Sequence, residues 1–374
     1  MRVYLDNAAT TPLDPEVLKE MYATMESHFG NPSSIHAHGR EARTVIEKAR
    51  KQVASSLNTS PSEIFFTSGG TEADNMAIRC GIIDNNIKQA ITTRIEHHAV
   101  LHTLEAMQAS GLIKLSFAET DQKGNLNHDH LEELLQNSDR SFVSLMHANN
   151  EIGTLTNIEA VGELCKKNDA IFHCDTVQTI GHYPIDLQKL KVHFVTCAAH
   201  KFHGPKGVGF LYINSNLKIN PLIYGGSQER NMRGGTENLY GIVGLSKALE
   251  IACRDMADYQ NYIQGLKSYM INELVGVIPG IEFNGEIDPD KSLYTVLNVL
   301  FPETDLADML LFNLDISGIS VSGGSACSSG TNIGSHVLEG IGSDPNRPAV
   351  RFSFSKLNTK EEIGYVIGKL KSLF

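Results

Sequence analysis

Lys201 stands at a place in the chain where a lysine can do covalent chemistry. It follows the apolar run 192–200 and precedes the glycine-rich turn 202–207. A lysine buried at such a corner loses hydration, which lowers the pKa of its ammonium group and frees the amine to attack a carbonyl carbon as a Schiff base forms. A surface lysine beside a turn explains this residue alone equally well, so its neighbours in the fold decide between the two.

A glycine-rich turn between a predicted strand and a predicted helix offers a binding site for an anion. The turn is 68–72, Ser-Gly-Gly-Thr-Glu, and it contains Gly70 and Thr71. Backbone N–H groups at the start of a helix, with a hydroxyl group beside them, bind phosphate. A plain strand-to-helix turn explains the same residues, so the motif alone does not decide.

Asp175 ends another predicted strand, and Gln178 follows three residues later. A buried carboxylate needs a cationic partner. The protonated nitrogen of a pyridine ring would be such a partner, and the aspartate would keep that ring able to accept electrons. The alternative interpretation is an aspartate that caps a helix.

His97 and Asn150 also follow predicted strands, 89–93 and 141–146. An imidazole at a strand end can stack on a flat ring and shuttle protons, although a lone histidine is often structural. The amide of Asn150 can orient a polar substituent, or it can belong to a simple turn.

Together these groups specify one cofactor, pyridoxal 5′-phosphate (PLP). The turn 68–72 would bind its phosphate, Asp175 its ring nitrogen, His97 its ring face and Lys201 its carbonyl group. Because ligands of parallel sheets lie at the carboxyl ends of the strands, we expect these side chains to meet.

Two residues nearer the C-terminus could act on an amino-acid substrate. Cys327 lies in 321–330, a run of small polar residues, whereas the other five cysteines lie in apolar surroundings. An exposed thiolate in such a run suits a nucleophile that reaches a substrate and moves away, and an incidental thiol in a linker is the alternative. Arg351 lies in a predicted strand, and its guanidinium can hold an amino-acid carboxylate by two hydrogen bonds.

Composition and charge exclude other classes of function. The 374 residues are 41% hydrophobic, and the formal net charge of -11 argues against nucleic-acid binding, which needs clustered Lys and Arg. Apolar runs of membrane-spanning length and the apolar core of a signal peptide are missing, so we expect a cytoplasmic protein without membrane contact. The cysteines lack metal-binding spacing, so no metal is expected.

Apolar periodicity predicts an α/β fold. Predicted strands are 62–67, 89–93, 141–146, 170–174, 192–197, 294–301, 319–322 and 349–355. Predicted helices are 74–82, 101–110, 158–168, an uninterrupted 241–274, 305–314 and a last one whose start is marked by the capping box of Thr359 and Glu362. We expect a large domain, 16–255, with a mostly parallel sheet covered by helices, and a smaller α/β domain, 1–15 and 256–374, that carries Cys327.

The chain resembles the class I (NifS/IscS-like) cysteine desulfurases, fold-type-I PLP enzymes of the aminotransferase class V family. The likeness runs nearly end to end. It is carried by the motifs at 4–12, 30–34, 67–72, 146–153, 173–178, 200–201, 230–236 and 325–327.

This resemblance implies a reaction and a set of site residues. A cysteine desulfurase takes sulfur from L-cysteine, releases L-alanine and forms a persulfide on Cys327. It then passes the sulfur to an acceptor protein for iron–sulfur cluster assembly or for thiolation of tRNA or a cofactor. The implied catalytic residues are Cys327, Lys201 and His97, with Asn150 and Arg351 holding the substrate carboxylate. The implied cofactor-binding residues are Gly70, Thr71, His97, Asn150, Asp175, Gln178, His200, Lys201 and Thr236. The loop 230–236 would reach the phosphate of a neighbouring subunit, which implies a homodimer.

Three features depart from the family pattern. Ala198 stands where relatives usually carry a hydroxyl residue that contacts the cofactor phosphate, so we expect one hydrogen bond fewer and weaker retention of the cofactor. Gly323 replaces a common serine, which should loosen the cysteine loop. The chain stops at Phe374 without the extended tail of scaffold-serving relatives, which leaves the sulfur acceptor open.

Other functions fit parts of the same pattern. A PLP-dependent selenocysteine lyase would share the cofactor residues but would not need the thiol of Cys327. An aminotransferase would release a keto acid rather than alanine. A non-catalytic sulfur-carrier scaffold would keep the fold without binding PLP, and the presence of Lys201, Asp175 and Cys327 argues against it.

Overall fold

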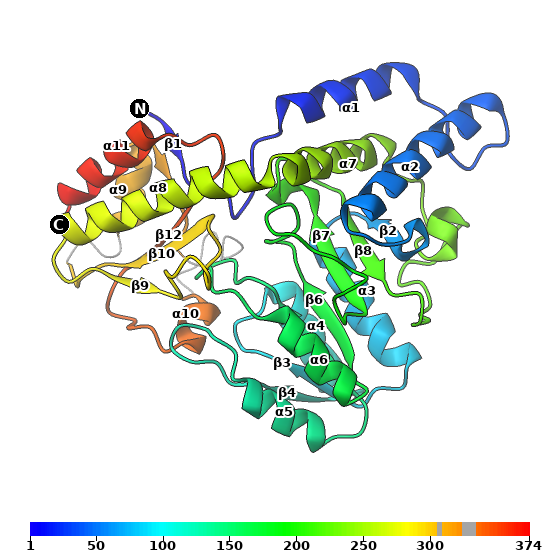
Figure 1. Cartoon of the computed structure of the whole chain (residues 1–374), viewed down its shortest axis with the longest axis horizontal. Coiled ribbons are helices and arrows are strands. Elements are labelled where there is room, and N and C mark those ends of the chain that lie inside the picture. Colours follow the sequence, from blue (N-terminus) through cyan, green and yellow to red (C-terminus); the bar gives the residue numbers. More distant parts are fainter. Residues whose placement is uncertain (305–308, 324–333) are drawn as a thin grey trace.

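A computed structural model describes residues 1–304, 309–323 and 334–374. Its largest sheet has seven strands in the order β2-β8-β7-β6-β5-β3-β4 (Figure 1). In chain order they are β2 Ile64–Thr67, β3 Gln89–Thr92, β4 Lys114–Phe117, β5 Ser141–Met146, β6 Ile171–Asp175, β7 Phe194–Ala198 and β8 Gly209–Ile213. Neighbouring strands are parallel except at β8, which is antiparallel to β2 and β7. The carboxyl ends of the other six strands therefore lie at one edge of the sheet.

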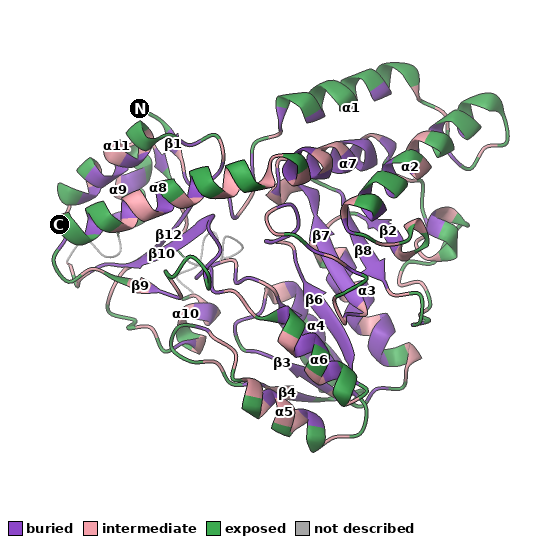
Figure 2. Cartoon of the chain, in the orientation of Figure 1, coloured by how far each residue is buried: buried purple, intermediate pink, exposed green. Residues whose placement is uncertain are grey.

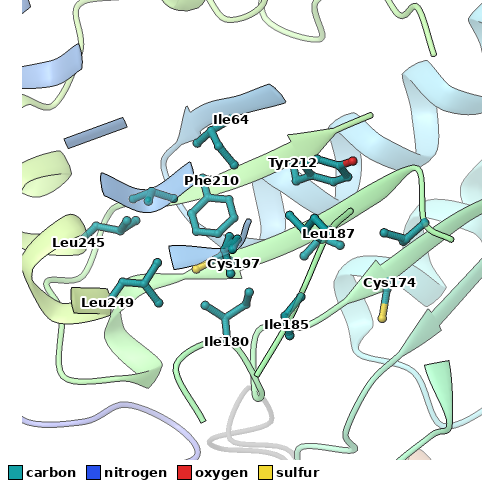
Figure 3. Close-up of a cluster of buried hydrophobic side chains, with 14 of the residues drawn as sticks. Ile64, Cys174, Ile180, Ile185, Leu187, Cys197, Phe210, Tyr212, Leu245 and Leu249 are labelled. Carbon is teal, nitrogen blue, oxygen red and sulfur yellow. The ribbon is translucent and has the colours of Figure 1, made fainter. Parts of the chain in front are cut away.

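Helices cover both faces of this sheet, which explains why its strands appear as continuous apolar runs. Phe194 packs on the face of the sheet that α3 and α4 cover, and Val195 packs on the opposite face. The covering helices are α2 Ala37–Ser56, α3 Gly70–Asp84, α4 His98–Ala109, α5 His128–Gln136, α6 Ile158–Lys167 and α7 Leu239–Arg254, and α1 Pro15–Ser27 packs on α7. Most residues of the central strands are buried (Figure 2). Figure 3 shows Phe210 of the sheet beside Leu245 and Leu249 of α7.

A second layer of structure is built from the last third of the chain and the first few residues. It contains a three-stranded antiparallel sheet, β12-β10-β9, and the parallel pair β1-β11. Its elements are β1 Val3–Tyr4, α8 Met256–Val277, β9 Glu282–Asn284, β10 Val296–Leu300, α9 Leu310–Ile316, β11 Ile319–Ser320, α10 His336–Gly340, β12 Ala349–Ser353 and α11 Lys360–Lys371. Val3 and Leu5 pack in one core with α8 and α11. This separate core supports the proposed division into residues 16–255 and residues 1–15 with 256–374.

The structure corrects the expectation of one uninterrupted helix over 241–274. The helix divides at Asp255, where φ is -104° and ψ is 12°, into α7 and α8. At this break the Asp255 carboxylate accepts hydrogen bonds from the side chains of Arg254 and Tyr259. No helix in the described ranges is long and apolar enough to cross a membrane.

Other predicted elements are confirmed with shifted ends, and four strands of the described ranges were missed. The capping box of Thr359 and Glu362 starts α11 as predicted. The strands β1, β4, β8 and β9 were not predicted, and the antiparallel β8 makes the large sheet mostly rather than wholly parallel, as expected. The predicted helix 305–314 begins at Leu310 among the described residues, because 305–308 lie outside them.

Candidate functional site

A cavity of about 250 Å³ opens at the carboxyl ends of the parallel strands. Predicted site residues that line it are Gly70 and Thr71 after β2, His97 after β3, Asn150 after β5, Asp175 and Gln178 at and after β6, His200 and Lys201 after β7, and Arg351 in β12. Two predicted site residues are not among them. Thr236 lines a separate cavity with Ser68 and Arg233, and Cys327 lies outside the described residues.

Lys201 is held in the cavity by a segment that sequence reasoning missed. The lysine ends the short helix η2 Ala199–Lys201, directly after β7. Its Nζ donates hydrogen bonds to the backbone carbonyl oxygens of Ala8 at 2.6 Å and Ala9 at 2.9 Å. Gln178 Nε2 also donates to the carbonyl of Ala8, at 3.1 Å. Backbone carbonyls leave no signature in residue types, which is why the role of residues 6–11 was not predicted.

Asp175 is a buried carboxylate at the end of β6. Burial, and then the negative charge of Asp74, raise the pKa of Asp175 to about 7. Its Oδ1 accepts a hydrogen bond from the backbone N–H of Val177 at 2.9 Å, within a turn, so Asp175 does not cap a helix as the alternative interpretation expected. Asp74 lines the same cavity, and burial raises its pKa to about 7 as well. A cation beside Asp175 would offset the cost of this buried charge, so the site fits a protonated pyridine nitrogen.

His97 is neutral and its tautomer is defined. It is the N-cap residue of α4, and its Nδ1 accepts a hydrogen bond from the backbone N–H of Ala99 at 3.1 Å. Burial, and then the positive charge of Lys201, lower the pKa of His97 to about 4. Since Nδ1 is the acceptor, the ring hydrogen lies on Nε2. The residue is therefore both the structural cap and a flat neutral ring at the cavity, as stacking on a cofactor requires.

The start of α3 forms the anion-binding end of the cavity. The helix begins at Gly70 after the cap residue Gly69, which has no side chain to satisfy the first N–H groups. A Cβ on Gly70 would lie 2.9 Å from Cγ2 of Val177, so only glycine allows this close packing. Thr71 adds a hydroxyl group. Ala198 lines the same end with a methyl group, where a hydroxyl residue would add a donor.

Arg351 is a second cationic residue, besides Lys201, in the lining of the cavity. It is 1% exposed, and its Nη1 donates to the backbone oxygen of Asn150 at 3.0 Å. Its Nη2 donates to Oδ1 of Asp6 at 2.7 Å, a partner that sequence reasoning missed. Within the described ranges, its Nε has no hydrogen-bond partner. A buried donor without a partner costs about 1–3 kcal/mol, so this side of the cavity fits an anionic ligand.

Two ion pairs fix the loop that carries Thr236. Arg50 donates two hydrogen bonds to the buried carboxylate of Glu229, at 2.7 and 2.8 Å. Arg233 binds Glu72, in the first turn of α3, at 2.9 and 3.1 Å. Glu229 and the two residues after it have φ of 43°, 56° and 68°, a left-handed conformation that costs energy for residues other than glycine. The loop is thus held in one shape beside the anion-binding turn.

The cysteines in apolar surroundings are poor nucleophiles. Cys80, Cys165, Cys174 and Cys197 are buried, and Cys253 is half-buried. Burial raises the pKa of each of these thiols. They remain protonated near neutral pH, so core packing accounts for them.

Comparisons with known proteins agree over the whole chain. The family described as aminotransferase class-V matches residues 3–366. A relative from Dictyoglomus turgidum, a cysteine desulfurase IscS, is 42% identical over 380 residues, covering 99% of this chain and 94% of the relative. A solved structure of a NifS-like protein has a TM-score of 0.91 at 39% identity, covering 100% of this chain and 99% of that one. A structure described as SspA in complex with cysteine has a TM-score of 0.81 at 30% identity, covering 96% and 100%.

Proposed function

We propose that this chain, which belongs to the aminotransferase class-V family and within it to the IscS- and NifS-like cysteine desulfurases, converts L-cysteine to L-alanine and leaves a persulfide on Cys327. Members of this family use PLP. The observation that carries the proposal is the single cavity that contains Lys201, Asp175 and Arg351. A relative of similar fold is described in complex with cysteine, which supports the choice of substrate.

The residues around the cavity would hold PLP by complementary charges. The start of α3, with Gly70 and Thr71, would bind the phosphate, and Asp175 would bind the ring nitrogen. His97 and Gln178 would hold the ring, with His200 alongside. When bound, PLP supplies an electron sink that stabilises negative charge at the substrate Cα.

Lys201 and His97 would move the protons. The lysine would hold the cofactor carbonyl group and, as a neutral amine, would take the proton from the substrate Cα. His97 carries its hydrogen on Nε2, so in this tautomer it donates a hydrogen bond. It can accept the proton of the substrate thiol only after Nδ1 releases the backbone N–H of Ala99 and the tautomer changes.

Arg351, Asn150 and Cys327 would act on L-cysteine itself. Arg351 would bind the carboxylate, with the amide of Asn150 beside it. The Cys327 thiolate would attack the substrate sulfur, so that a sulfur–sulfur bond forms while the carbon–sulfur bond breaks. The electron pair of the broken bond goes to the substrate β-carbon, which takes up a proton to become the methyl group of alanine. The persulfide would then pass its terminal sulfur to an acceptor protein, in iron–sulfur cluster assembly or in thiolation of tRNA or a cofactor.

We also propose that the protein acts as a homodimer. Helix α1 exposes an apolar stripe of Leu18, Tyr22 and Met25, which are 57%, 61% and 46% exposed. Phe29 and Tyr224 are 71% and 79% exposed. A stripe of this kind on a soluble protein marks a protein–protein interface. A second copy covering it would let the rigid loop with Thr236 approach the neighbouring phosphate, and sedimentation equilibrium would measure the mass.

The decisive experiment compares alanine release from L-cysteine by wild type and by Cys327→Ser, with dithiothreitol present. We expect alanine from wild type only, and we expect mass spectrometry to detect a persulfide on Cys327 in a parallel sample that lacks dithiothreitol. Cys253→Ser, which removes the half-buried thiol, is the matched control and should keep full activity. Equal alanine from Cys327→Ser would leave a PLP lyase that does not use this thiol. Keto acid instead of alanine would indicate an aminotransferase, and failure to bind PLP would indicate a scaffold.

A further inference from the structure

The edge of Arg351 that suits a carboxylate is partly occupied by the protein itself. Nε and Nη2 lie on the same edge of a guanidinium plane, and arginine uses such an edge to bind a carboxylate by two parallel hydrogen bonds. In this structure Nη2 donates to Oδ1 of Asp6 at 2.7 Å. Nε is buried and, among the residues that the structure describes, has no hydrogen-bond partner. One half of the edge is therefore filled by Asp6, and the other half is open.

Asp6 is anchored independently of Arg351. Its Oδ1 also accepts a hydrogen bond from Oγ of Ser322 at 2.8 Å. Its backbone forms a bridge with Ser353 of β12, directly beyond β1. The Asp6 side chain is 20% exposed, whereas that of Arg351 is 1% exposed. The carboxylate can therefore move away from Nη2 toward solvent, and its segment is then held by the bridge to Ser353 without the contact to Arg351.

We propose that Asp6 is a specificity-determining residue that neutralises Arg351 in the empty site and gives up Nη2 to the carboxylate of the amino-acid substrate. This inference rests on the proposed function, in which Arg351 holds the carboxylate of L-cysteine. The exchange replaces one anion by another, so the buried guanidinium keeps a counter-ion throughout. A ligand without a carboxylate offers no replacement, because displacing Asp6 would leave a buried charge unpaired. Asp6 thus raises the concentration of L-cysteine needed for binding and excludes neutral thiols and amines.

The test compares two non-reactive ligands that differ only in charge at this position, L-alanine and L-alaninamide. Each is used as an inhibitor of sulfide release from L-cysteine by the holoenzyme, and its binding is also measured by calorimetry. Asp6→Asn keeps the size of the side chain and removes its charge. We expect this variant to bind L-alanine about three- to tenfold more tightly, since one charged hydrogen bond no longer competes, and to bind L-alaninamide more tightly by a larger factor, since no buried ion pair has to be broken to admit it.

Asp14→Asn is the matched control. Asp14 is also an acidic residue near the N-terminus with a cationic partner, Lys356, and it lines a different cavity from that of Arg351. This variant should leave the binding of both ligands unchanged. If Asp6→Asn instead weakens L-alanine binding, Asp6 orients Arg351 for the ligand rather than competing with it. If L-alanine binding is unchanged, Asp6 does not affect Arg351. Either result would show that the inference is wrong.

A measurement on wild type covers the case in which Asp6→Asn does not fold. L-Alanine should speed the hydrogen exchange of peptides that span residues 3–8, because Asp6 loses Arg351, while L-alaninamide should not. Equal exchange with both ligands would overturn the inference. If wild type binds the two ligands equally well and Arg351→Lys changes neither, Arg351 is not the carboxylate site. That result would overturn this part of the proposed function as well, and so it is distinguishable from a failure of Asp6 alone.

Discussion

Replacing Asp175 by asparagine should stabilise the cofactor-free protein and weaken its binding of PLP. Burial raises the pKa of Asp175 from the ordinary value of 3.8 to about 7. The folded state therefore binds the proton more tightly than the unfolded state, so the stability of wild type falls as the pH rises from about 4 to about 7. At about 1.36 kcal/mol for each pH unit, ionisation costs up to about 4 kcal/mol above pH 7. Asparagine does not ionise, so the variant escapes this cost.

The cost can be expressed as a melting temperature. A chain of 374 residues unfolds with an entropy of about 0.8 kcal/mol/K, at about 2.1 cal/mol/K per residue. We therefore expect the cofactor-free variant to melt about 5 °C above wild type at pH 8, but only about 2 °C above it at pH 5. The same substitution removes a charged partner of the ring nitrogen, which should weaken PLP binding by about 1.5–3 kcal/mol, or roughly ten- to a hundredfold.

The assay is a thermal melt by circular dichroism of cofactor-stripped protein at the two pH values, followed by titration with PLP. The exposed Asp290 supplies the control, since Asp290→Asn should change neither quantity. If Asp175→Asn has the same melting temperature as wild type at pH 8, or if its melting temperature exceeds that of wild type by as much at pH 5 as at pH 8, then Asp175 does not carry a buried charge. Unchanged PLP affinity would contradict its role as the partner of the ring nitrogen.

Three further substitutions test other parts of the site. Lys201→Ala should lose both turnover and the visible absorbance of bound PLP, and a fully active variant would refute the role of this lysine. Ala198→Ser should tighten PLP binding about tenfold, because it adds a hydroxyl donor beside the start of α3. Fluorescence titration would measure the affinity, and an unchanged affinity would mean that the hydroxyl does not reach the phosphate. Glu229→Gln should destabilise the protein by about 3 kcal/mol in urea unfolding, because Arg50 loses its buried counter-ion and is left with the half-exposed Glu47. A loss below about 1 kcal/mol would count against this pair.

The central strands could be predicted because their physical setting leaves a clear pattern. A parallel strand covered on both faces must be apolar at nearly every position, as Phe194 and Val195 illustrate by packing on opposite sides of β7. The edge strand β4 has an exposed Lys114 and a half-buried Ser116 and Phe117 around the buried Leu115, so its pattern is weaker. The helix break at Asp255 was missed because Asp255 and its side-chain partners, Arg254 and Tyr259, are residues that a helix can equally contain. Neither glycine nor proline marks it.

The site could be predicted as far as its chemistry resides in side chains at strand ends. Asp175 and Lys201 could be proposed as site residues because a carboxylate or an amine after a buried strand is unusual. Asp74 was missed because the sequence pattern of α3 does not distinguish it from a polar residue on the outer face of a helix. Only the packing shows that it is 1% exposed. Asp6 was missed because its partner, Arg351, is more than three hundred residues away in the chain.

The N-terminal segment gives these separate features a common explanation. Residues 6–11 hold both cationic groups that would act on the substrate: Ala8 and Ala9 accept hydrogen bonds from Lys201, and Asp6 accepts one from Arg351. An amino acid that enters the cavity must replace contacts of this kind rather than find unsatisfied charges. The free energy of binding is then the difference between the contacts that the amino acid makes and the contacts that the segment gives up. A ligand that contacts only one of the two cations therefore binds weakly. Substitutions that weaken the segment should therefore strengthen the binding of amino acids while reducing discrimination between them and neutral analogues.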